Sequence, residues 1–444
     1  MTFDLALTGD VILNRPVRDY ADPRFHELAD LLRDSTCSIA HFESTIHNYT
    51  GSEVYPAAEA GWTWMRSPLE IVEDLTWMGI DAVTLASNHS LDYSYGGLKE
   101  TIEAFDRAGI KRAGTGNDLA AASSPTFLHT GGMRVGIISM ASSFQPWARA
   151  GAARTDMPGR PGLNPLVFSY CGNQAVLDLA FGTFRSMGWW VTEVSDGEWW
   201  VNPAGLHNGI TRFVLSDDEV LSSVVDEFDL ARHRKTVRDA RERCDLLIVH
   251  VHNHEWAPNR GIFVPPAFTT QLAHALLDEG ADVFFAEGSH APLRGIEIYN
   301  GKVIFYDPGD FVRMAPTVQK FPQDFYDRHH HELPSPATAT PVEVSRARAA
   351  GRYHKPDAPV GGYRSARVTG GMVPVCRFDS DGALVRVDLH PFVWSLGAAH
   401  ESGVPLAADG LEATGLLEYM QEISAEFGTT IEIANGRGTI RVGA

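Results

Sequence analysis

The stretch Ile80–Asp92, Ile-Asp-Ala-Val-Thr-Leu-Ala-Ser-Asn-His-Ser-Leu-Asp, constrains the fold of this chain more than any other. Its apolar run Ala82–Ala86 predicts a buried strand, and helical spacing of apolar residues begins at Tyr95. Asn88 and His89 therefore lie between the end of a strand and the start of a helix. In an α/β sheet that edge is where ligands bind. Taken alone, this dipeptide could instead be a turn Asn beside a surface His with no role in ligand binding.

Four other apolar runs also end near side chains that can bind a metal ion. These predicted strands are Phe3–Thr8, Ser38–Phe42, Leu246–Val251 and Asp282–Ala286. The candidates from all five strand ends are Asp10, Glu43, Asn88 with His89, His252 with His250 and His254, and Glu287 with His290. Each has a structural explanation by itself, such as a helix cap for Asp10. Five strand ends of this kind favour a single metal site.

Two further expectations concern this site. We expect His250 to point into the sheet, on the argument that its position alternates with that of His252. Oxygen ligands with two or three imidazoles suit a divalent ion such as Mn²⁺, Mg²⁺, Ca²⁺, Fe²⁺ or Zn²⁺. A bridging carboxylate would allow two ions.

The charge balance and the cysteines limit the class of protein. The chain carries 37 basic and 56 acidic residues, a net charge of −19, which argues against nucleic acid or an anionic membrane as a partner. Its four cysteines are far apart in the sequence and form no CxxC pair, as expected of free thiols in a reducing compartment. No leader or membrane-spanning run is evident, so we predict a cytoplasmic protein.

The βα pattern is interrupted twice, which predicts a core with two large insertions. We assign 1–143 and 229–312 to the core and 371–444 to C-terminal strands and a helix that complete it. Residues 313–370 are rich in Pro, Arg and His and are predicted to form a lid or a connection. Residues 144–228 are rich in Trp and are predicted to lie over the active face. The tryptophans that we single out, either as a small separate core or as substrate-binding residues, are Trp189, Trp190, Trp199 and Trp200.

The order of these motifs resembles the CapA (poly-γ-glutamate capsule protein) family. The motifs are Gly-Asp, Phe-Glu-Ser, Ser-Asn-His-Ser-Leu-Asp, His-x-His and Gly-Ser-His-x-x-x-x-Gly-Ile-Glu-Ile-Tyr-Asn-Gly-Lys-Val-Ile-Phe-Tyr. They cover roughly residues 3–140 and 229–312. That family is similar to the calcineurin-like metallophosphoesterases, so the resemblance implies a metallophosphatase-like α/β/α sandwich with two large insertions.

The resemblance also implies roles for single residues. His89 matches the histidine that acts as an acid. The first motif normally has a histidine two residues after its Asp, and that position is Ile12 here. Glu287 stands where CapA proteins usually have a histidine. We therefore expect one ion site to lack an imidazole and the other to gain a carboxylate. The positions that match the family's metal ligands are Asp10, Glu43, Asn88, His252 and His290.

Three functions remain open from the sequence. CapA-like enzymes of lasso-peptide biosynthesis epimerise the C-terminal Trp of a ribosomally made precursor. This chain resembles them in its CapA-type core, its altered ligands and its Trp-rich insertion. The resemblance implies a metal-dependent epimerase that binds a neutral or basic peptide by its C-terminus, with neither PLP nor ATP. Its candidate acids and bases are His89, His254 and Glu287. The alternatives are a phosphoesterase or peptide/amide hydrolase with the same ligands, and a non-catalytic binding module.

Overall fold

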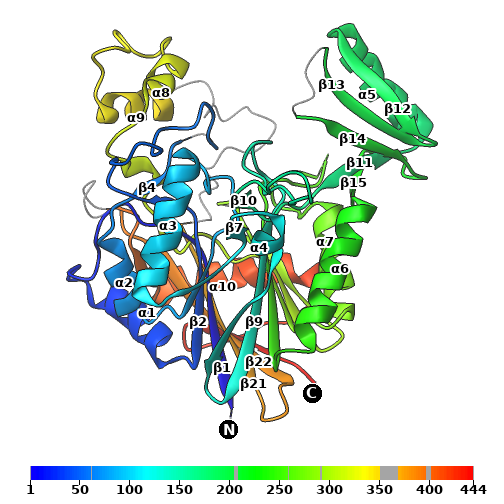
Figure 1. The fold of residues 1–444 in the computed structure, drawn as a ribbon. Helices are drawn as coiled ribbons and strands as arrows, with labels where there is room; N and C mark the ends of the chain where they lie inside the picture. The colour runs from blue at the N-terminus through cyan, green and yellow to red at the C-terminus, as the bar shows by residue number, and fades with distance from the viewer. Residues whose placement is uncertain are drawn as a thin grey trace.

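Two sheets lie face to face at the centre of the molecule, with helices outside each of them (Figure 1). The computed structural model describes residues 2–61, 63–204, 209–258, 260–290, 293–350, 369–396 and 402–443. Within these ranges the two sheets carry the predicted strand ends at one shared edge, at the top of the core in Figure 1.

The first sheet is built mainly from the two ends of the chain and runs in the order β24-β25-β22-β21-β1-β2-β5-β6. β1, β2, β5 and β6 are parallel, and β21 joins β1 antiparallel. The strands of this sheet are β1 (Phe3–Ile12), β2 (Cys37–Phe42), β5 (Ala82–Thr84), β6 (Lys111–Ala113), β21 (Gly370–Phe378), β22 (Leu384–Trp394), β24 (Glu432–Ala434) and β25 (Arg437–Arg441), with β20 (Val312–Arg313) beside β1 and β23 (Pro405–Ala407) beside β22.

The second sheet has the order β18-β19-β17-β16-β9-β8. β9, β16, β17 and β19 are parallel and β8 and β18 are antiparallel edge strands. Its strands are β8 (Thr126–Thr130), β9 (Met133–Ala141), β16 (Leu246–His252), β17 (Val283–Glu287), β18 (Arg294–Tyr299) and β19 (Lys302–Asp307). Side chains such as Leu5, Ile39, Ile137 and Ile248 from the two sheets belong to one hydrophobic core.

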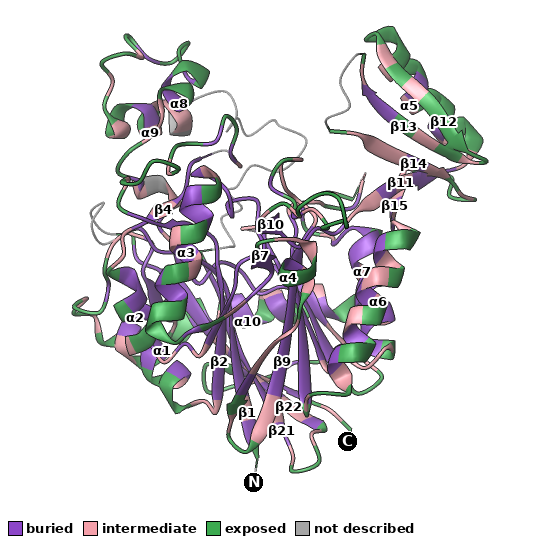
Figure 2. Cartoon of the chain, viewed as in Figure 1, coloured by how far each residue is buried: buried purple, intermediate pink, exposed green. Residues whose placement is uncertain are grey.

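Helices cover the outer faces of both sheets because each presents an apolar stripe inward. Phe25 and Phe105, from two helices outside the first sheet, are fully buried, and Phe268 and Leu272 are buried outside the second. The strands are buried over most of their length and the helices are exposed on their outer sides (Figure 2). The helices are α1 (Pro23–Asp34), α2 (Ile71–Trp77) and α3 (Ser94–Ala108) outside the first sheet, α6 (Glu227–Arg241) and α7 (Ala267–Asp278) outside the second, and α10 (Gly410–Ala425) against β18 and β22.

Short elements connect this core at its upper edge. They are β3 (Thr45–Ile46) paired with β4 (Arg66–Ser67), β7 (Thr115–Gly116) paired with β10 (Gly162–Leu163), and the helix α4 (Leu119–Ser123). Among the described residues, no helix combines the length and the apolar character that crossing a lipid bilayer requires.

The first insertion forms a small α/β unit at the upper right of Figure 1. Its sheet has the order β12-β13-β14-β11-β15. One helix packs on this sheet, with Leu177 and Phe181 of the helix in one small core with Phe213 of the sheet. Its elements are β11 (Phe168–Gly172), α5 (Gln174–Ser186), β12 (Trp189–Ser195), β13 (Glu198–Pro203), β14 (Thr211–Leu215) and β15 (Ser222–Val225).

The second insertion begins with the 3-10 helix η1 (Ala315–Thr317), followed by α8 (Gln323–Arg328) and α9 (Pro341–Ala350). Phe325 of α8 and Val344 of α9 are buried in a small core with Trp64 and Tyr93, which belong to the loops near Asn88 and His89. Residues 351–368 of the predicted lid lie outside the described residues.

Candidate metal centre

The first sheet contributes two carboxylates and an imidazole to the shared edge. The register between β1 and β2 shifts between Thr8 and Asp10, and such bulges re-aim side chains next to functional sites. Gly9 makes this possible, since a Cβ there would lie 2.2 Å from the carbonyl oxygen of Gly309. His41 and Glu43 are two residues apart and point to the same side. The distance from His41 Nε2 to Asp10 Oδ1 is 3.8 Å.

The second sheet supplies a carboxylate held by two histidines. His250 Nε2 lies 2.8 Å and His252 Nδ1 2.9 Å from the Glu287 Oε1 atom. The expectation that His250 points away from the site is wrong. Residues two apart on a strand face the same side, so His250 and His252 both reach Glu287, and both rings stack on His41.

Asn88 and His89 lie on a tight turn after β5. The Ser90 hydroxyl accepts a hydrogen bond from the Ser87 backbone N–H at 2.9 Å and donates to the Leu85 carbonyl at 2.6 Å, which fixes the turn. Asn88 Oδ1 then lies 2.9 Å from His252 Nε2.

The ring of His89 is oriented by a buried carboxylate. Its Nδ1 lies 2.6 Å from Asp92 Oδ2, which also accepts a hydrogen bond from the Met65 backbone N–H. Its Nε2 faces Glu43 Oε1 at 3.7 Å. This pairing favours the tautomer with the proton on Nδ1, which leaves Nε2 as the atom that can accept a proton.

His290 is oriented in the same way from the second sheet. Its Nδ1 lies 3.0 Å from Asp310 Oδ1 and 3.1 Å from Asp10 Oδ2, and its Nε2 lies 3.8 Å from Glu43 Oε1. The backbone of His290 has a φ of 60°, in the left-handed region that residues other than Gly rarely adopt. Strain of this kind costs about 1–3 kcal/mol and is concentrated at functional sites.

Burial and charge shift the pKa values of this cluster in opposite directions. Burial, and after it the charge of Asp10, raises the pKa of Glu43 and of Glu287 well above the usual value. Burial alone would lower the pKa of His290, but the carboxylates of Asp310, Glu43 and Asp10 raise it well above the usual value. Carboxylates packed this closely repel one another and attract a positive charge.

Several buried polar atoms of the cluster have no hydrogen-bond partner among the described residues. They include both carboxylate oxygens of Asp10, both of Glu43, and His41 Nε2. His41 Nδ1 lies 2.8 Å from the Thr84 hydroxyl, and its Nε2 faces the carboxylates of Asp10 and Glu287 at 3.8 Å and 3.7 Å. Buried polar groups without partners are costly, and a divalent cation would satisfy all of them.

The residues present therefore fit a divalent cation. Three groups have ligand atoms that all lie within 4.8 Å of one another: Asp10, His41, His252 and Glu287 form the first, Glu43, His254 and His290 the second, and Asp10, His290 and Asp310 the third. Oxygen ligands together with imidazoles suit Mn²⁺ and similar hard or borderline ions.

The structure brings all eight sequence-predicted metal and acid/base residues into this cluster. His254 is the most accessible of them, with its Nε2 3.1 Å from His252 Nε2 and 3.9 Å from Glu43 Oε1. Sequence reasoning missed His41, Asp92 and Asp310. His41 approaches Asp10 from β2, with its Nε2 3.8 Å from Asp10 Oδ1, so an imidazole lies beside Asp10 although position 12 is Ile.

The four tryptophans of the first insertion do not all face the same way. Trp189 and Trp199 pack in the core beneath α5. Trp190 and Trp200 alternate with them along β12 and β13 and are 49% and 40% exposed. Substrate binding by these residues stays a prediction, and only Trp190 and Trp200 offer an exposed ring face to a ligand.

A loop covers the cluster at its first-sheet side. A Cβ at Gly61 would lie 2.1 Å from Asn88 Nδ2 and 3.3 Å from His89 Nε2, so the loop backbone touches both side chains. The second insertion holds this loop, because Arg348 of α9 donates a hydrogen bond to the Thr63 hydroxyl.

We expect the Gly61→Ala substitution to displace Asn88 and to weaken divalent-metal binding by roughly 10- to 100-fold, as the loss of supporting contacts does at other metal sites. Isothermal titration with Mn²⁺ would measure this. Gly132→Ala is the matched control, because a Cβ there meets nothing within 4 Å, although the φ of 81° at Gly132 makes some loss of stability unavoidable. Unchanged affinity in Gly61→Ala would contradict the assigned role of the loop.

Comparison with known proteins adds a family relationship. A family model described as bacterial capsule synthesis protein PGA_cap matches residues 4–315, a range that contains the whole cluster. The uncharacterized protein y4sH of Sinorhizobium fredii is 31% identical over 452 residues, 99% of this chain and 93% of its own length. The probable polyglutamine synthesis accessory protein Rv0574c of Mycobacterium tuberculosis is 28% identical over 244 residues, 54% of this chain and 47% of its own. The capsule biosynthesis protein CapA of Bacillus anthracis is 22% identical over 314 residues, 69% and 59% respectively.

Proposed function

Because this chain belongs to the PGA_cap (CapA) family of bacterial capsule synthesis proteins, a branch of the calcineurin-like phosphoesterase superfamily, we propose that it is a metal-dependent enzyme that epimerises the C-terminal residue of a peptide. The family confirms the predicted fold class, and the ligand cluster supports metal binding. The reaction and the substrate are our proposal.

The observation that carries the proposal is a pair of histidine–aspartate dyads facing one carboxylate. His89 is held by Asp92 and His290 by Asp310, each through Nδ1. Their Nε2 atoms lie 3.7 Å and 3.8 Å from the same oxygen, Glu43 Oε1. His89 comes from a loop of the first sheet and His290 from a loop of the second, so a substrate between the sheets would meet one imidazole from each side.

Inversion at a carbon needs this two-sided arrangement. One neutral imidazole takes the proton from Cα, and an imidazolium on the other side gives a proton to the opposite face. The first imidazole ends protonated and the second neutral, so the reverse reaction can start at once from the product. The carboxylates that raise the pKa of His290 favour its protonated form as the acid of one direction.

The residues that would hold a divalent cation are those with unsatisfied or converging ligand atoms: Asp10, His41, His252 and Glu287 in one group, and Glu43 with His254 and His290 in another. The resemblance adds Asn88, whose Oδ1 lies 2.9 Å from His252 Nε2. A bound cation would supply positive charge beside the substrate carboxylate and so lower the cost of removing the neighbouring Cα proton. The family pattern makes His290 a metal ligand as well. We propose His290 as an acid or base because its Nδ1 contacts Asp310.

The surroundings favour a peptide with an aromatic C-terminal residue. Trp147 and Trp200 are about two-fifths exposed, and both line a cavity of ≈ 690 Å³ beside Ser142, whose backbone N–H donates to the His252 carbonyl. Aromatic side chains supply large contact areas for such ligands. Relatives in this family are named for capsule and polyglutamine synthesis. The net charge of −19 disfavours a polyanion such as poly-γ-glutamate and favours a neutral or basic peptide.

Mass spectrometry in D₂O tests the proposal. We expect the metal-loaded protein to introduce one deuterium into a peptide with a free C-terminal Trp, without cleavage, and to produce the D-Trp epimer. The same peptide with a C-terminal amide should exchange far more slowly, because it lacks the carboxylate.

A phosphoesterase or amide hydrolase with the same ligands would give a different result. A peptide cleaved into two fragments whose masses together exceed the parent mass by one water would show amide hydrolysis. Phosphate released from simple phosphoesters would show a phosphoesterase, and either result would refute our proposal. The EDTA-treated protein is the control, and equal exchange by the amide and the free acid would rule out recognition of the carboxylate.

A further inference from the structure

A hollow runs along the first insertion beside the metal centre. Its near part is the ≈ 690 Å³ cavity that Ser142 lines, and its far part is a cavity of ≈ 1020 Å³. Trp200 and Arg212 line both, so the two cavities meet at this pair. Each is as large as a pocket for a small ligand, and together they can hold several residues of a peptide.

The near part of the hollow is aromatic and basic. Phe144, Trp147 and Tyr170 line it together with Arg149 and Arg160. Among the described residues, none accepts a hydrogen bond from the Arg149 guanidinium, so that charge is available to a ligand. Ser142 lines the same part and donates a hydrogen bond to Glu255 Oε2 at 2.7 Å, so the near part reaches the residue that follows His254.

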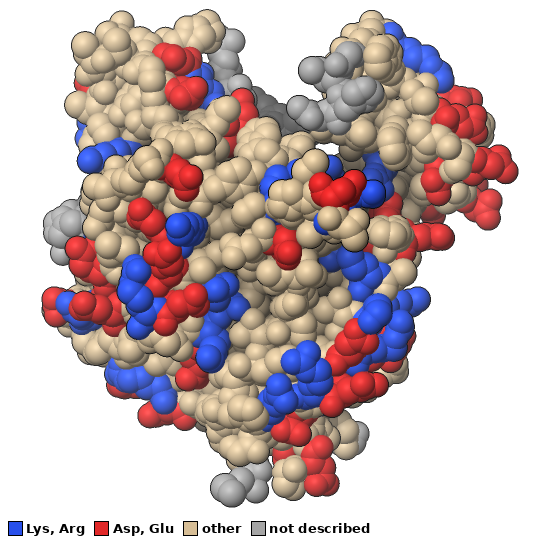
Figure 3. Space-filling view, viewed as in Figure 1, with Lys and Arg blue, Asp and Glu red and all other residues tan. Residues whose placement is uncertain are grey.

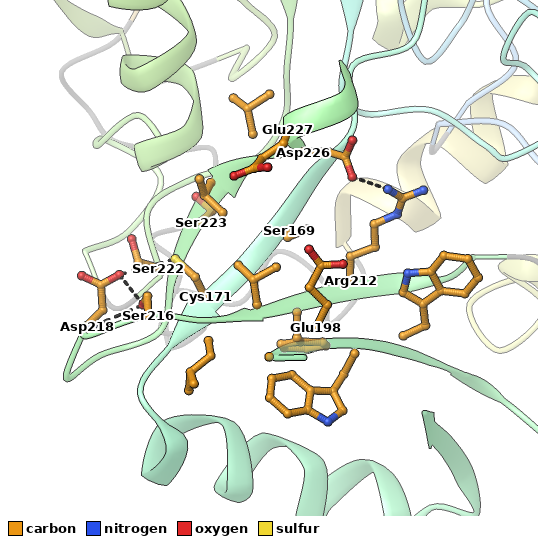
Figure 4. Close-up of a pocket in the computed structure, with 18 of the residues that line it drawn as sticks. Ser169, Cys171, Glu198, Arg212, Ser216, Asp218, Ser222, Ser223, Asp226 and Glu227 are labelled. Carbon is orange, nitrogen blue, oxygen red and sulfur yellow. Dashed lines mark hydrogen bonds and ion pairs between the residues drawn. The ribbon is translucent and has the colours of Figure 1, made fainter. Parts of the chain in front are cut away.

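The far part of the hollow is acidic. Glu198 points into it from β13, and Asp226 and Glu227 line its opposite side (Figure 4). Asp196 and Asp218 add two further carboxylates at its walls, and Phe228 is 80% exposed there.

The visible face of the insertion is also rich in Asp and Glu (Figure 3). Among the described residues that line the far part, Arg212 is the one basic side chain, and it is already paired with Asp226. The uncompensated charge of this part is therefore negative.

We propose that this hollow binds the upstream part of the peptide substrate, with the peptide running from the acidic far part to its C-terminus at the metal centre, and that it selects peptides with basic residues upstream. This inference rests on the proposed function for the identity of the ligand. The aromatic near part then binds the side chains at the C-terminal end of the peptide. Arg149 and Arg160 can pair with acidic side chains of the peptide close to its C-terminus.

The charge pattern gives the peptide one favoured direction. Arg212 separates the basic near part from the acidic far part, and its guanidinium lies 5.8 Å from the centre of the Trp200 ring. A peptide with upstream lysines gains attraction only if it enters with its C-terminus towards Ser142. Exposed charge pairs of this kind set specificity and association rate more than raw affinity, and salt weakens them.

Fluorescence anisotropy with two synthetic peptides tests the inference. Both carry an N-terminal fluorophore and a free C-terminal Trp, and they differ only in upstream lysines or upstream glutamates. We expect the metal-loaded protein to bind the lysine peptide on the order of ten-fold more tightly at low ionic strength. The double variant Glu198→Lys with Glu227→Lys should remove the preference, because the two new cations balance Asp196 and Asp218. The milder Glu198→Gln with Glu227→Gln should reduce the preference, even if the lysine variant folds poorly.

Asp178→Lys is the matched control, because Asp178 is an exposed residue of α5, which packs on the opposite face of the insertion's sheet from Trp200. It raises the net charge by two, as the double glutamine variant does, and should keep the preference. Equal binding of both peptides, or an equal loss in Asp178→Lys, would overturn the inference. Charge-selective binding without deuterium exchange would contradict the proposed function alone, and exchange without charge selection would contradict only the hollow.

Discussion

The Glu43→Gln variant is expected to bind divalent metal more than about 100-fold more weakly than the parent protein, since even residues that only support a ligand cost 10- to 100-fold at other sites. In the metal-free state, the same variant is expected to melt at a higher temperature than the metal-free parent. Both effects follow from one feature, the complete burial of a carboxylate whose two oxygens have no hydrogen-bond partner among the described residues.

The sign of the second effect follows from the pKa of Glu43, which burial and then Asp10 raise well above its usual value. An acid whose pKa is higher in the folded than in the unfolded state stabilises the fold only at low pH. That contribution begins to be lost as the pH rises past the unfolded pKa, about 4.3, and is gone once the pH has passed the higher folded pKa. At neutral pH this carboxylate therefore destabilises the metal-free fold, and a neutral amide relieves the cost.

Thermal melts with EDTA and with excess Mn²⁺, together with titration calorimetry, measure both effects. Glu73→Gln is the matched control, because that side chain is 65% exposed and forms a surface ion pair with Arg18. It should change stability by no more than about 0.5 kcal/mol and leave metal affinity unchanged. A metal-free Glu43→Gln protein that melts below the parent would show that no ion is needed to compensate this carboxylate.

His89→Gln and His290→Gln are each expected to slow epimerisation by about 10²- to 10⁴-fold, the usual contribution of a positioned acid or base. Each variant should still exchange the Cα proton of one stereoisomer of the peptide, because one base remains on one side. The two variants should differ in which stereoisomer exchanges. Deuterium uptake by the L-Trp and the D-Trp peptide, measured separately, tests this.

Asp92→Asn and Asp310→Asn are the matched variants for the orienting carboxylates. They should lower kcat more than they raise KM, because they disturb the orientation of a ring and touch no substrate. Metal content, measured on all four variants, separates the roles of His290. Loss of metal from His290→Gln would make it a ligand, as the family pattern has it. Equal loss of exchange from both stereoisomers in both histidine variants, with metal and fold intact, would refute the two-base arrangement.

Parts of the site were predictable because parallel strands end at a common edge. Asp10, Asn88 and Glu287 each follow or end an apolar run, so their meeting required no knowledge of distant contacts. His41 was missed because it lies inside β2, where every residue is buried and the sequence does not reveal which face is which. The spacing of two between His41 and Glu43 was the available signal.

The same rule of alternation explains the error about His250 and limits what could be said of the tryptophans. Positions 250 and 252 share a face, and applying the rule correctly would have placed both near Glu287. For the pairs at 189–190 and 199–200, alternation predicts that one ring of each pair faces each side. The choice of side depends on where α5 packs, which only the tertiary structure determines.

The distribution of the ligands over two separate sheets has a consequence for how the chain is held together. Asp10 and Glu43 belong to the first sheet and His252 and Glu287 to the second, with no strand shared between the two sheets. A cation bound to both sets is a cross-link between distant parts of the chain, comparable to a disulfide in its effect on chain entropy. The chain's four cysteines are all free and supply no such link. Metal supply would then govern how long the molecule survives proteolysis as well as its activity.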